Sequence, residues 1–212
     1  MQRVLVALVS ACLLAGAAQA SPITMHTANS PVGNQSWPGL VGLEFEVLGS
    51  NFTVTSLGVY DSGSNGIKDP GPAAGPAKLT TILFDTTTQT PLATVEFTSA
   101  DGAGANSYLF KDINPLVLAP GQYGIVSFGF DQNNLLHNTD FGGAGPNRAP
   151  ELSYVQSIYS NGTDVPTAVF VGGATDYFDG PNMTFTIPAP GAILLCMIGT
   201  SVVGLLRRRR SL

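Results

Sequence analysis

The chain has 212 residues, of which only 11% are charged, and its formal net charge is −5 at pH 7. Arg3 and the four arginines at 207–210 lie in the terminal segments, so residues 21–187 hold four cations against fourteen acids, a net charge of −10. This argues against nucleic acid or an anionic membrane surface as a partner of that region, since both need clustered cations. Cys12 and Cys196 also lie outside it, which excludes disulfides and thiolate metal sites there.

The first twenty residues have the pattern of a secretory signal peptide. Arg3 precedes an apolar run from Val4 to Leu14, and a small-x-small triplet ends at Ala20. We therefore expect signal peptidase to cut between Ala20 and Ser21. The alternative is a lipoprotein signal, because the four residues ending at Cys12 resemble a lipobox, although the apolar run before Cys12 is short for that purpose.

The middle of the chain consists of short β-rich runs separated by Gly, Pro, Asn, Ser and Thr. After residues 21–40, which we expect to be a loosely ordered leader, strict alternation at 42–47 places Leu43, Phe45 and Val47 on one side of a strand. Further runs of aromatic and β-branched residues follow at 52–60, 79–85, 92–97, 108–113, 116–130, 152–159, 167–173 and 183–187. They predict one all-β domain over 41–187, an antiparallel β-sandwich of jelly-roll or immunoglobulin-like type, with a turn at Pro120-Gly121.

The loop from Asp61 to Asp69 is a candidate calcium site. Asp61, Asn65 and Asp69 have the spacing of positions 1, 5 and 9 of an EF-hand. Gly63 and Pro72 occupy two other ligand positions, however, and no helical pattern flanks the loop. A plain turn, in which Asp61 and Asn65 bond their own backbone, is the preferred interpretation. A calcium site of loop oxygens with a different geometry is the alternative.

Catalytic motifs are missing from the sequence. Glu44 and Glu46 share a strand face at about 7 Å, a separation that overlaps that of glycosidase carboxylates, but alternating glutamates on a solvent face are ordinary in sheets. Because His26 falls in the leader, a histidine-based catalytic set or zinc site would depend on His137 alone. The glycine-rich segment 141–148 lacks the strand–loop–helix setting of phosphate sites. We expect no enzyme and no cofactor.

Aromatic side chains offer a different chemistry, since they could stack on sugar rings. The candidates are Trp37, Tyr154, Tyr159 and Tyr177. Core or strand-edge positions are the preferred interpretation for most of them.

The last 25 residues combine a proline pair, an apolar segment and a cationic cluster. Pro188, Ala189 and Pro190 precede the uncharged segment 191–206, which is followed by Arg207, Arg208, Arg209 and Arg210. Sixteen residues of helix span about 24 Å, less than the bilayer core of about 30 Å, but snorkelling arginines lengthen the span. We expect a transmembrane helix whose arginines remain in the cytoplasm.

This tail resembles the PEP-CTERM sorting signal, in which Pro-Glu-Pro, a hydrophobic helix and an arginine cluster are recognised by exosortases of Gram-negative bacteria. The departure is Ala189 in place of the usual glutamate. The resemblance implies that the helix holds the chain in the inner membrane and that exosortase cuts near 188–190. A permanent, uncut anchor is the alternative.

Segments of the middle region resemble a sandwich domain of unassigned function that often precedes this tail. They are 54–66, 79–85, 118–123 and 180–188. The resemblance implies a fold and no active site. We therefore expect an exported protein with a structural or interaction role at the cell surface or in the extracellular polymer matrix, with polysaccharide as a further partner. A carbohydrate- or calcium-binding adhesion module is the alternative. A hydrolase that uses carboxylates for catalysis is a third interpretation.

Overall fold

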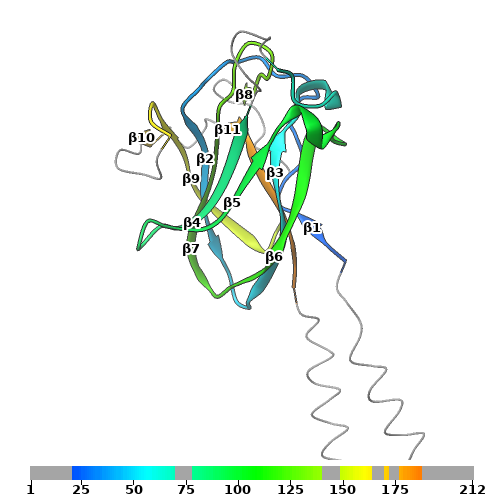
Figure 1. The fold of residues 1–212 in the computed structure, drawn as a ribbon. Helices are drawn as coiled ribbons and strands as arrows, with labels where there is room; N and C mark the ends of the chain where they lie inside the picture. Colours follow the sequence, from blue (N-terminus) through cyan, green and yellow to red (C-terminus); the bar gives the residue numbers. More distant parts are fainter. Residues whose placement is uncertain (1–20, 70–77, 140–148, 164–169, 172–176, 188–212) are drawn as a thin grey trace, which may run out of the picture. The chain divides into compact units, whose positions relative to one another are not determined.

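The structure is a computed structural model that describes residues 21–69, 78–139, 149–163, 170–171 and 177–187. Pro22–Phe185 forms one compact unit. The second unit, Met1–Ser21 with Thr186–Leu212, lies almost entirely outside the described residues. Among the residues described, regular structure is β-strand except for two short 3-10 turns, Ser62–Ser64 and Ser99–Asp101 (Figure 1).

Two antiparallel sheets and a small ribbon make up the compact unit. The larger sheet has the order β10 (Phe170–Val171), β9 (Leu152–Ser160), β2 (Leu40–Val47), β7 (Gly121–Phe128), β4 (Leu79–Asp85) and β5 (Thr90–Phe97). The smaller sheet has the order β1 (Ile23–Thr24), β12 (Pro181–Thr186), β3 (Phe52–Tyr60) and β6 (Tyr108–Leu118). The ribbon pairs β8 (His137–Thr139) with β11 (Tyr177–Asp179). This confirms an all-β fold of antiparallel sheets.

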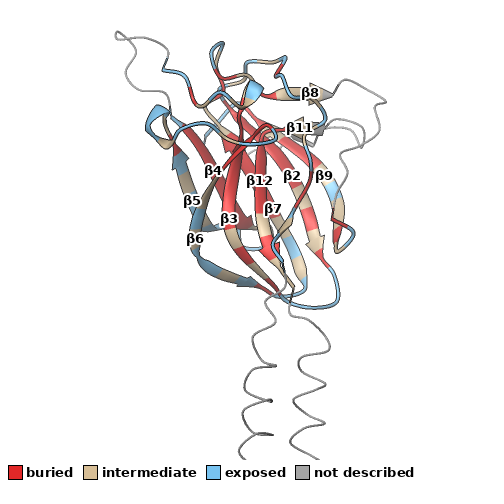
Figure 2. Cartoon of the chain, turned by 90° about the vertical axis from the view of Figure 1, so that its right-hand side faces the viewer, coloured by how far each residue is buried: buried red, intermediate tan, exposed pale blue. Residues whose placement is uncertain are grey.

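The core lies between the two sheets, and strands of both sheets carry many buried residues (Figure 2). Val41, Leu79 and Phe97 of the larger sheet pack with Val59 and Leu109 of the smaller one. The two layers are also joined by a buried hydrogen bond from Thr81 Oγ1 to the carbonyl of Gly58, at 3.1 Å. Burial of these apolar side chains is the main stabilising contribution in a domain without disulfides.

Alternation in β2 follows the predicted pattern. Leu43, Phe45 and Val47 are buried, whereas Glu44 and Glu46 are partly exposed. Residues 108–118, by contrast, form one continuous strand where the sequence predicted two runs.

Pro115 lies within β6, and its place in the sheet explains why the strand is not interrupted there. β6 is an edge strand, and its register with β3 shifts between Val54 and Ser56, opposite the proline. A proline at an edge and beside a bulge removes no ladder hydrogen bond. Pro120 lies between β6 and β7, which belong to different sheets, so the predicted turn connects the two layers.

Residues 21–40 are packed against the sandwich, and the expectation of a loosely ordered leader is wrong for this segment. β1 pairs with β12, the Met25 N–H donates to the carbonyl of Met183 at 2.9 Å, and His26 is 2% exposed. Further along, Gln35 and Leu136 exchange two backbone hydrogen bonds. The leader is ordered because strands far away in the sequence supply its hydrogen-bond partners.

Candidate functional site

The β8–β11 ribbon lies at one end of the sandwich (Figure 2). Its register places Asn138 opposite Phe178 and His137 opposite Asp179. Successive side chains of a strand point to opposite faces. One face of the ribbon therefore carries an amide and an aromatic ring, and the other carries a histidine and a carboxylate.

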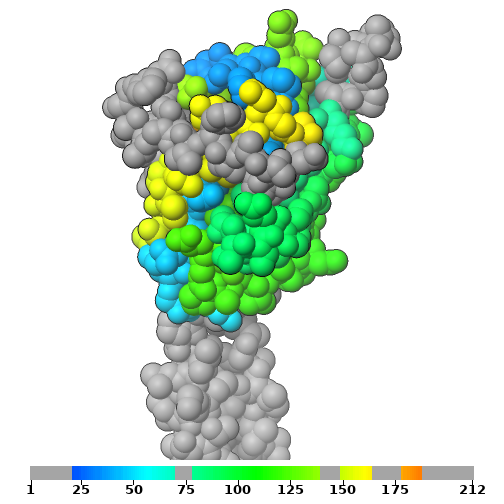
Figure 3. Space-filling view, turned by 90° about the vertical axis from the view of Figure 1, so that its left-hand side faces the viewer, coloured from blue at the N-terminus to red at the C-terminus, as the bar shows by residue number. Residues whose placement is uncertain are grey.

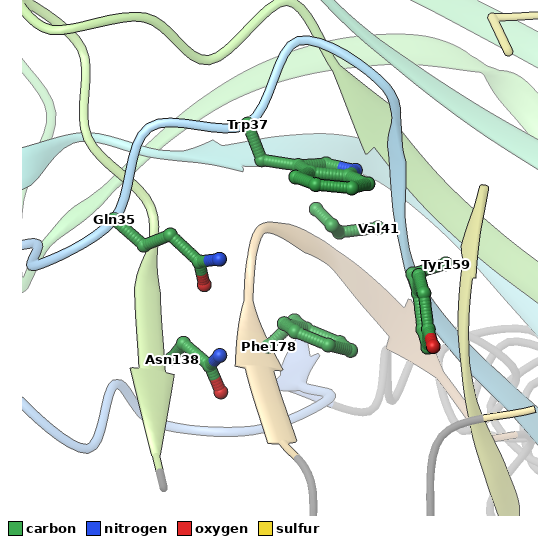
Figure 4. Close-up of a pocket in the computed structure, with 6 residues that line it drawn as sticks. All are labelled: Gln35, Trp37, Val41, Asn138, Tyr159 and Phe178. Atoms are coloured by element: carbon green, nitrogen blue, oxygen red, sulfur yellow. The ribbon is translucent and has the colours of Figure 1, made fainter. Parts of the chain in front are cut away.

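The first face borders a pocket of about 200 Å³ (Figure 4). Its lining residues come from the leader, β2, β8, β9 and β11, and are Gln35, Trp37, Val41, Asn138, Tyr159 and Phe178. The leader that carries Trp37 and the strand that carries Tyr159 lie next to one another on the surface shown in Figure 3. The pocket thus unites segments from the whole length of the described chain.

Three aromatic rings form the apolar part of this pocket. The ring centroids of Trp37 and Tyr159 are 6.2 Å apart at an interplanar angle of 78°, and those of Tyr159 and Phe178 are 6.0 Å apart at 63°. Edge-to-face packing of this kind is favourable for aromatic pairs. A Cβ at Gly39 would lie 2.0 Å from the carbonyl oxygen of Ser160 and 3.0 Å from Trp37 Nε1, so only glycine lets β9 and the indole approach the chain this closely.

Two buried polar atoms of the pocket have no hydrogen-bond partner among the described residues. Gln35 Oε1 and Trp37 Nε1 are both buried, and neither forms a hydrogen bond with any described residue. Figure 4 shows the amides of Gln35 and Asn138 pointing toward the middle of the pocket. The backbone of Asn138 is held by Asn34, whose side-chain oxygen accepts from the Asn138 N–H at 2.8 Å. Buried polar atoms without partners are rare in native proteins and call for an explanation.

Behind the ribbon, both histidines of the chain meet one carboxylate. His137 Nδ1 lies 3.2 Å from Asp179 Oδ2, and His26 Nε2 lies 4.0 Å from Asp179 Oδ1. His26 Nε2 is hydrogen-bonded to the Tyr108 hydroxyl at 2.8 Å, and the Asn29 N–H donates to Asp179 Oδ2 at 2.8 Å. We call His26, Tyr108, His137 and Asp179 the carboxylate cluster. The sequence-based argument that His137 would stand alone is therefore wrong.

Burial raises the pKa values of two members of this cluster, Asp179 and Tyr108. It raises the pKa of the Asp179 carboxyl, and the Asn29 N–H and the neighbouring His137 oppose part of that rise. Burial, together with the charge of Asp179, also raises the pKa of the Tyr108 hydroxyl well above its usual value, and that of Tyr60 rises for the same two reasons. Because His26, Tyr108 and Asp179 are each at most 3% exposed, these three groups contact protein and are closed to a substrate.

The candidate calcium residues are engaged in backbone and side-chain hydrogen bonds. Both oxygens of Asp61 accept from the Gly66 N–H at 3.0 Å, and Oδ1 also accepts from the Asn65 N–H at 3.1 Å. Asp69 accepts from Ser99 Oγ at 2.9 Å. No group of three or more His, Cys, Asp or Glu side chains that could hold a metal ion occurs among the described residues. These contacts fit the turn interpretation of the loop.

The remaining site candidates lie apart from the pocket or outside the description. Glu44 Oε2 accepts from Gln156 Nε2 at 2.6 Å, and the Tyr154 hydroxyl is hydrogen-bonded to Ser157 at 2.7 Å. Ser21 is exposed at the start of the described chain, and the backbone of Tyr177 belongs to β11.

Several predicted features fall outside the described residues. They are Ala20, the segment 141–148, Pro188, Ala189, Pro190, the helix predicted at 191–206, and Arg207, Arg208, Arg209 and Arg210. Among the residues that are described, the structure contains no helix long and apolar enough to cross a membrane.

Sequence reasoning named Trp37 and Tyr159 but missed Gln35, Asn138, Phe178 and Asp179. The run Tyr177-Phe178-Asp179 before Gly180 is a short strand followed by a breaker, which is a recognisable though weak signal. The two amides give no such signal, because Asn and Gln are common in loops.

Comparison with known proteins adds little. No family model matches the chain, and no curated protein matches it. Among solved structures, the crystal structure of the infectious bursal disease virus VP2 subviral particle aligns at 14% identity and a TM-score of 0.19, covering 90% of this chain and 47% of the viral one. This chain thus spans about half the length of the viral protein, and the likeness is too low to carry an argument.

Proposed function

We propose that this chain is an exported β-sandwich with a recognition role at the cell surface or in the extracellular matrix. In this proposal the sandwich is of jelly-roll or immunoglobulin-like type, signal peptidase removes residues 1–20, and the segment 191–206 spans the inner membrane. An exosortase then recognises Pro188 to Pro190 and the arginines and cuts the chain near the prolines. The protein recognises a partner and catalyses no reaction.

The pairing of the first and last strands is the observation that carries this proposal. Ile23 is the register partner of Phe185, and Thr24 is the partner of Thr184. The predicted cut after Ala20 falls just before β1, and Pro188 follows just after β12 ends at Thr186. The two cuts proposed here lie before β1 and after β12 in the sequence and remove no residue of the described core, so we expect a chain processed at both ends to keep its fold.

The polar groups of the sandwich favour recognition over catalysis. Three members of the carboxylate cluster are closed to solvent, and Glu44 of the predicted carboxylate pair is hydrogen-bonded to Gln156. The pocket, in contrast, presents buried polar atoms that no described residue satisfies. A pocket whose described lining carries such atoms and no charged residue is suited to binding.

Intact mass spectrometry of the protein from its native host tests the export and sorting route. We expect a chain that begins at Ser21 and ends near Pro190. A parallel strain carrying Ala189→Glu, which restores the residue usual in the resembling motif, should yield the same product in equal or greater amount. A chain that keeps Leu212 in both strains would contradict sorting by cleavage. Cleavage of the variant alone would identify Ala189 as the residue that makes the tail a permanent anchor.

A further inference from the structure

We infer that the pocket between the leader and the β8–β11 ribbon binds a neutral sugar ring. The inference deepens the proposed function by giving its recognition site a ligand class. It requires no cleavage of the tail, so it can fail or succeed independently of the sorting route.

The aromatic rings of the pocket can pack against the apolar face of a sugar. Trp37, Tyr159 and Phe178 stand roughly edge to face, so their planes bound the pocket from different directions (Figure 4). A sugar ring has an apolar face of C–H groups, which packs on an aromatic face through dispersion and weak C–H contacts. Val41 adds an aliphatic contact.

The polar atoms of the pocket can form hydrogen bonds with the hydroxyls of a sugar. Gln35 Oε1 is a buried acceptor and Trp37 Nε1 a buried donor, and neither has a partner among the described residues, so a ligand that supplies those partners gains binding free energy. A primary amide offers both a donor and an acceptor, and an indole offers a donor. One hydroxyl of a sugar can donate to Gln35 Oε1, and a neighbouring hydroxyl can accept from the Trp37 Nε1–H. A purely apolar ligand would leave these atoms unsatisfied, which disfavours it.

The charge of the pocket selects a neutral sugar. None of its six lining residues is charged. Among the described residues of the ribbon, the ionisable pair His137 and Asp179 belongs to the opposite face. Residues 21–187 carry a net charge of −10, which repels uronic acids and phosphorylated sugars.

The volume of the pocket sets the size of the ligand. Pockets for drug-sized ligands are typically about 300–1,000 Å³, and this one is about 200 Å³. It therefore suits one ring, either a chain end or a single residue of a polysaccharide. Binding through one ring is expected to be weak for the isolated protein and stronger for a surface that carries many copies of it.

Trp37 is the only tryptophan of the chain and lies in the pocket, so its fluorescence reports this site alone. The full chain, purified in a detergent without a sugar headgroup, is titrated with short oligomers of glucose, mannose and galactose. Oligomers of glucuronic acid provide the charged comparison. We expect a saturable change in Trp37 emission with at least one neutral oligomer and none with the charged one.

Alanine substitutions of the two amide side chains test whether the sugar binds in this pocket. Gln35→Ala and Asn138→Ala should each weaken the affinity, measured by calorimetry, by about tenfold. The matched controls are Gln132→Ala and Asn133→Ala, which change the same residue types at exposed positions outside the pocket and should leave the affinity unchanged. Far-UV circular dichroism and thermal unfolding verify that each variant is folded.

Three results would overturn the inference. The first is the absence of saturable binding to every neutral oligomer. The second is binding that both pocket variants leave unchanged, which would place it elsewhere. The third is tighter binding of the glucuronic acid oligomers than of the neutral ones.

Discussion

The two faces of the β8–β11 ribbon differ in how their polar groups are satisfied. On the inner face, Asp179 accepts hydrogen bonds from the Asn29 backbone and is surrounded by both histidines and Tyr108. On the pocket face, one residue away on each strand, Asn138 lies beside buried polar atoms for which the described chain provides no partner. The carboxylate on the inner face is thus hydrogen-bonded, although the nearby His137 Nδ1 forms no hydrogen bond with a described residue, whereas the pocket face holds two buried atoms without described partners.

This difference separates a contribution to stability from a contribution to binding. Removing a member of a closed buried network leaves its former partners unsatisfied and lowers stability. Removing a group that forms no hydrogen bond lowers the free energy of unfolding only slightly. Variants on the two faces should therefore affect different measurements.

The largest effect is expected from Asp179→Ala. This change leaves the Asn29 N–H and the hydroxyl of Tyr108 without their carboxylate, so the free energy of unfolding should fall by roughly 3 kcal/mol. For a domain of this size the melting temperature should fall by about 6–12 °C. Urea unfolding of the full chain in detergent measures the change. Asp112→Ala, at an exposed position of β6, is the control, and a loss below about 1 kcal/mol for Asp179→Ala would show that the cluster is not a stabilising network.

Alkaline pH tests the same network without a mutation. The pKa of Tyr108 is raised well above 10, so the folded protein keeps this proton at pH values where the unfolded chain, with an ordinary tyrosine pKa, releases it. The unfolded state then binds fewer protons, and stability falls as the pH rises above about 10. Tyr108 alone should contribute a loss of about 1.4 kcal/mol per pH unit, and Tyr60 acts in the same direction. Urea midpoints that stay constant from neutral pH to well above 10 would contradict this.

At neutral pH, Tyr108→Phe isolates one hydroxyl of the cluster. The variant loses the hydrogen bond to His26 and the contact with Asp179 while the ring remains, so the free energy of unfolding should fall by about 1.5 kcal/mol. Tyr123→Phe is the matched control, because that hydroxyl donates to the carbonyl of Ala119 at an exposed site. Equal losses for the two variants would remove the distinction between buried and exposed hydroxyls on which this prediction depends.

The smallest effect on stability is expected on the pocket face. Gln35→Ala removes a buried oxygen that has no donor among the described residues, so the free energy of unfolding should fall by no more than about 0.5 kcal/mol. Thermal unfolding in the absence of sugar measures the change. A loss above about 1 kcal/mol would mean that the amide supports the fold, and the contrast between the two faces would disappear.

The strands could be predicted from the sequence because they are local features. The alternation of Leu43, Phe45 and Val47 and the β-rich runs at 52–60 and 79–85 agree with β2, β3 and β4. The register and the edge position of β6 could not be predicted, because they depend on which strands become neighbours. The same limit explains why residues 21–40 were expected to be loose.

The site was harder to predict than the fold because its contacts join distant positions. His26 and Tyr108 are 82 residues apart, and Tyr108 and Asp179 are 71 apart. Trp37 and Tyr159 were recognised as candidates from their residue type, but only the fold shows that they share one pocket with Gln35 and Asn138. Residue type indicates which side chains can act, and tertiary pairing decides which of them meet.

The short path from β11 to β12 has a mechanical consequence. Phe178 of the pocket is followed, past Asp179 and Gly180, by β12, which ends at Thr186 between β1 and β3. Under the proposed function, a pull between a ligand in the pocket and the C-terminal end of the sandwich would be transmitted along one strand of about 20 Å. Because β12 has a neighbour on each side, its hydrogen bonds bear that load together in shear. If the proposed function holds, β12 links the binding pocket to the C-terminal end of the sandwich as a short load-bearing connection.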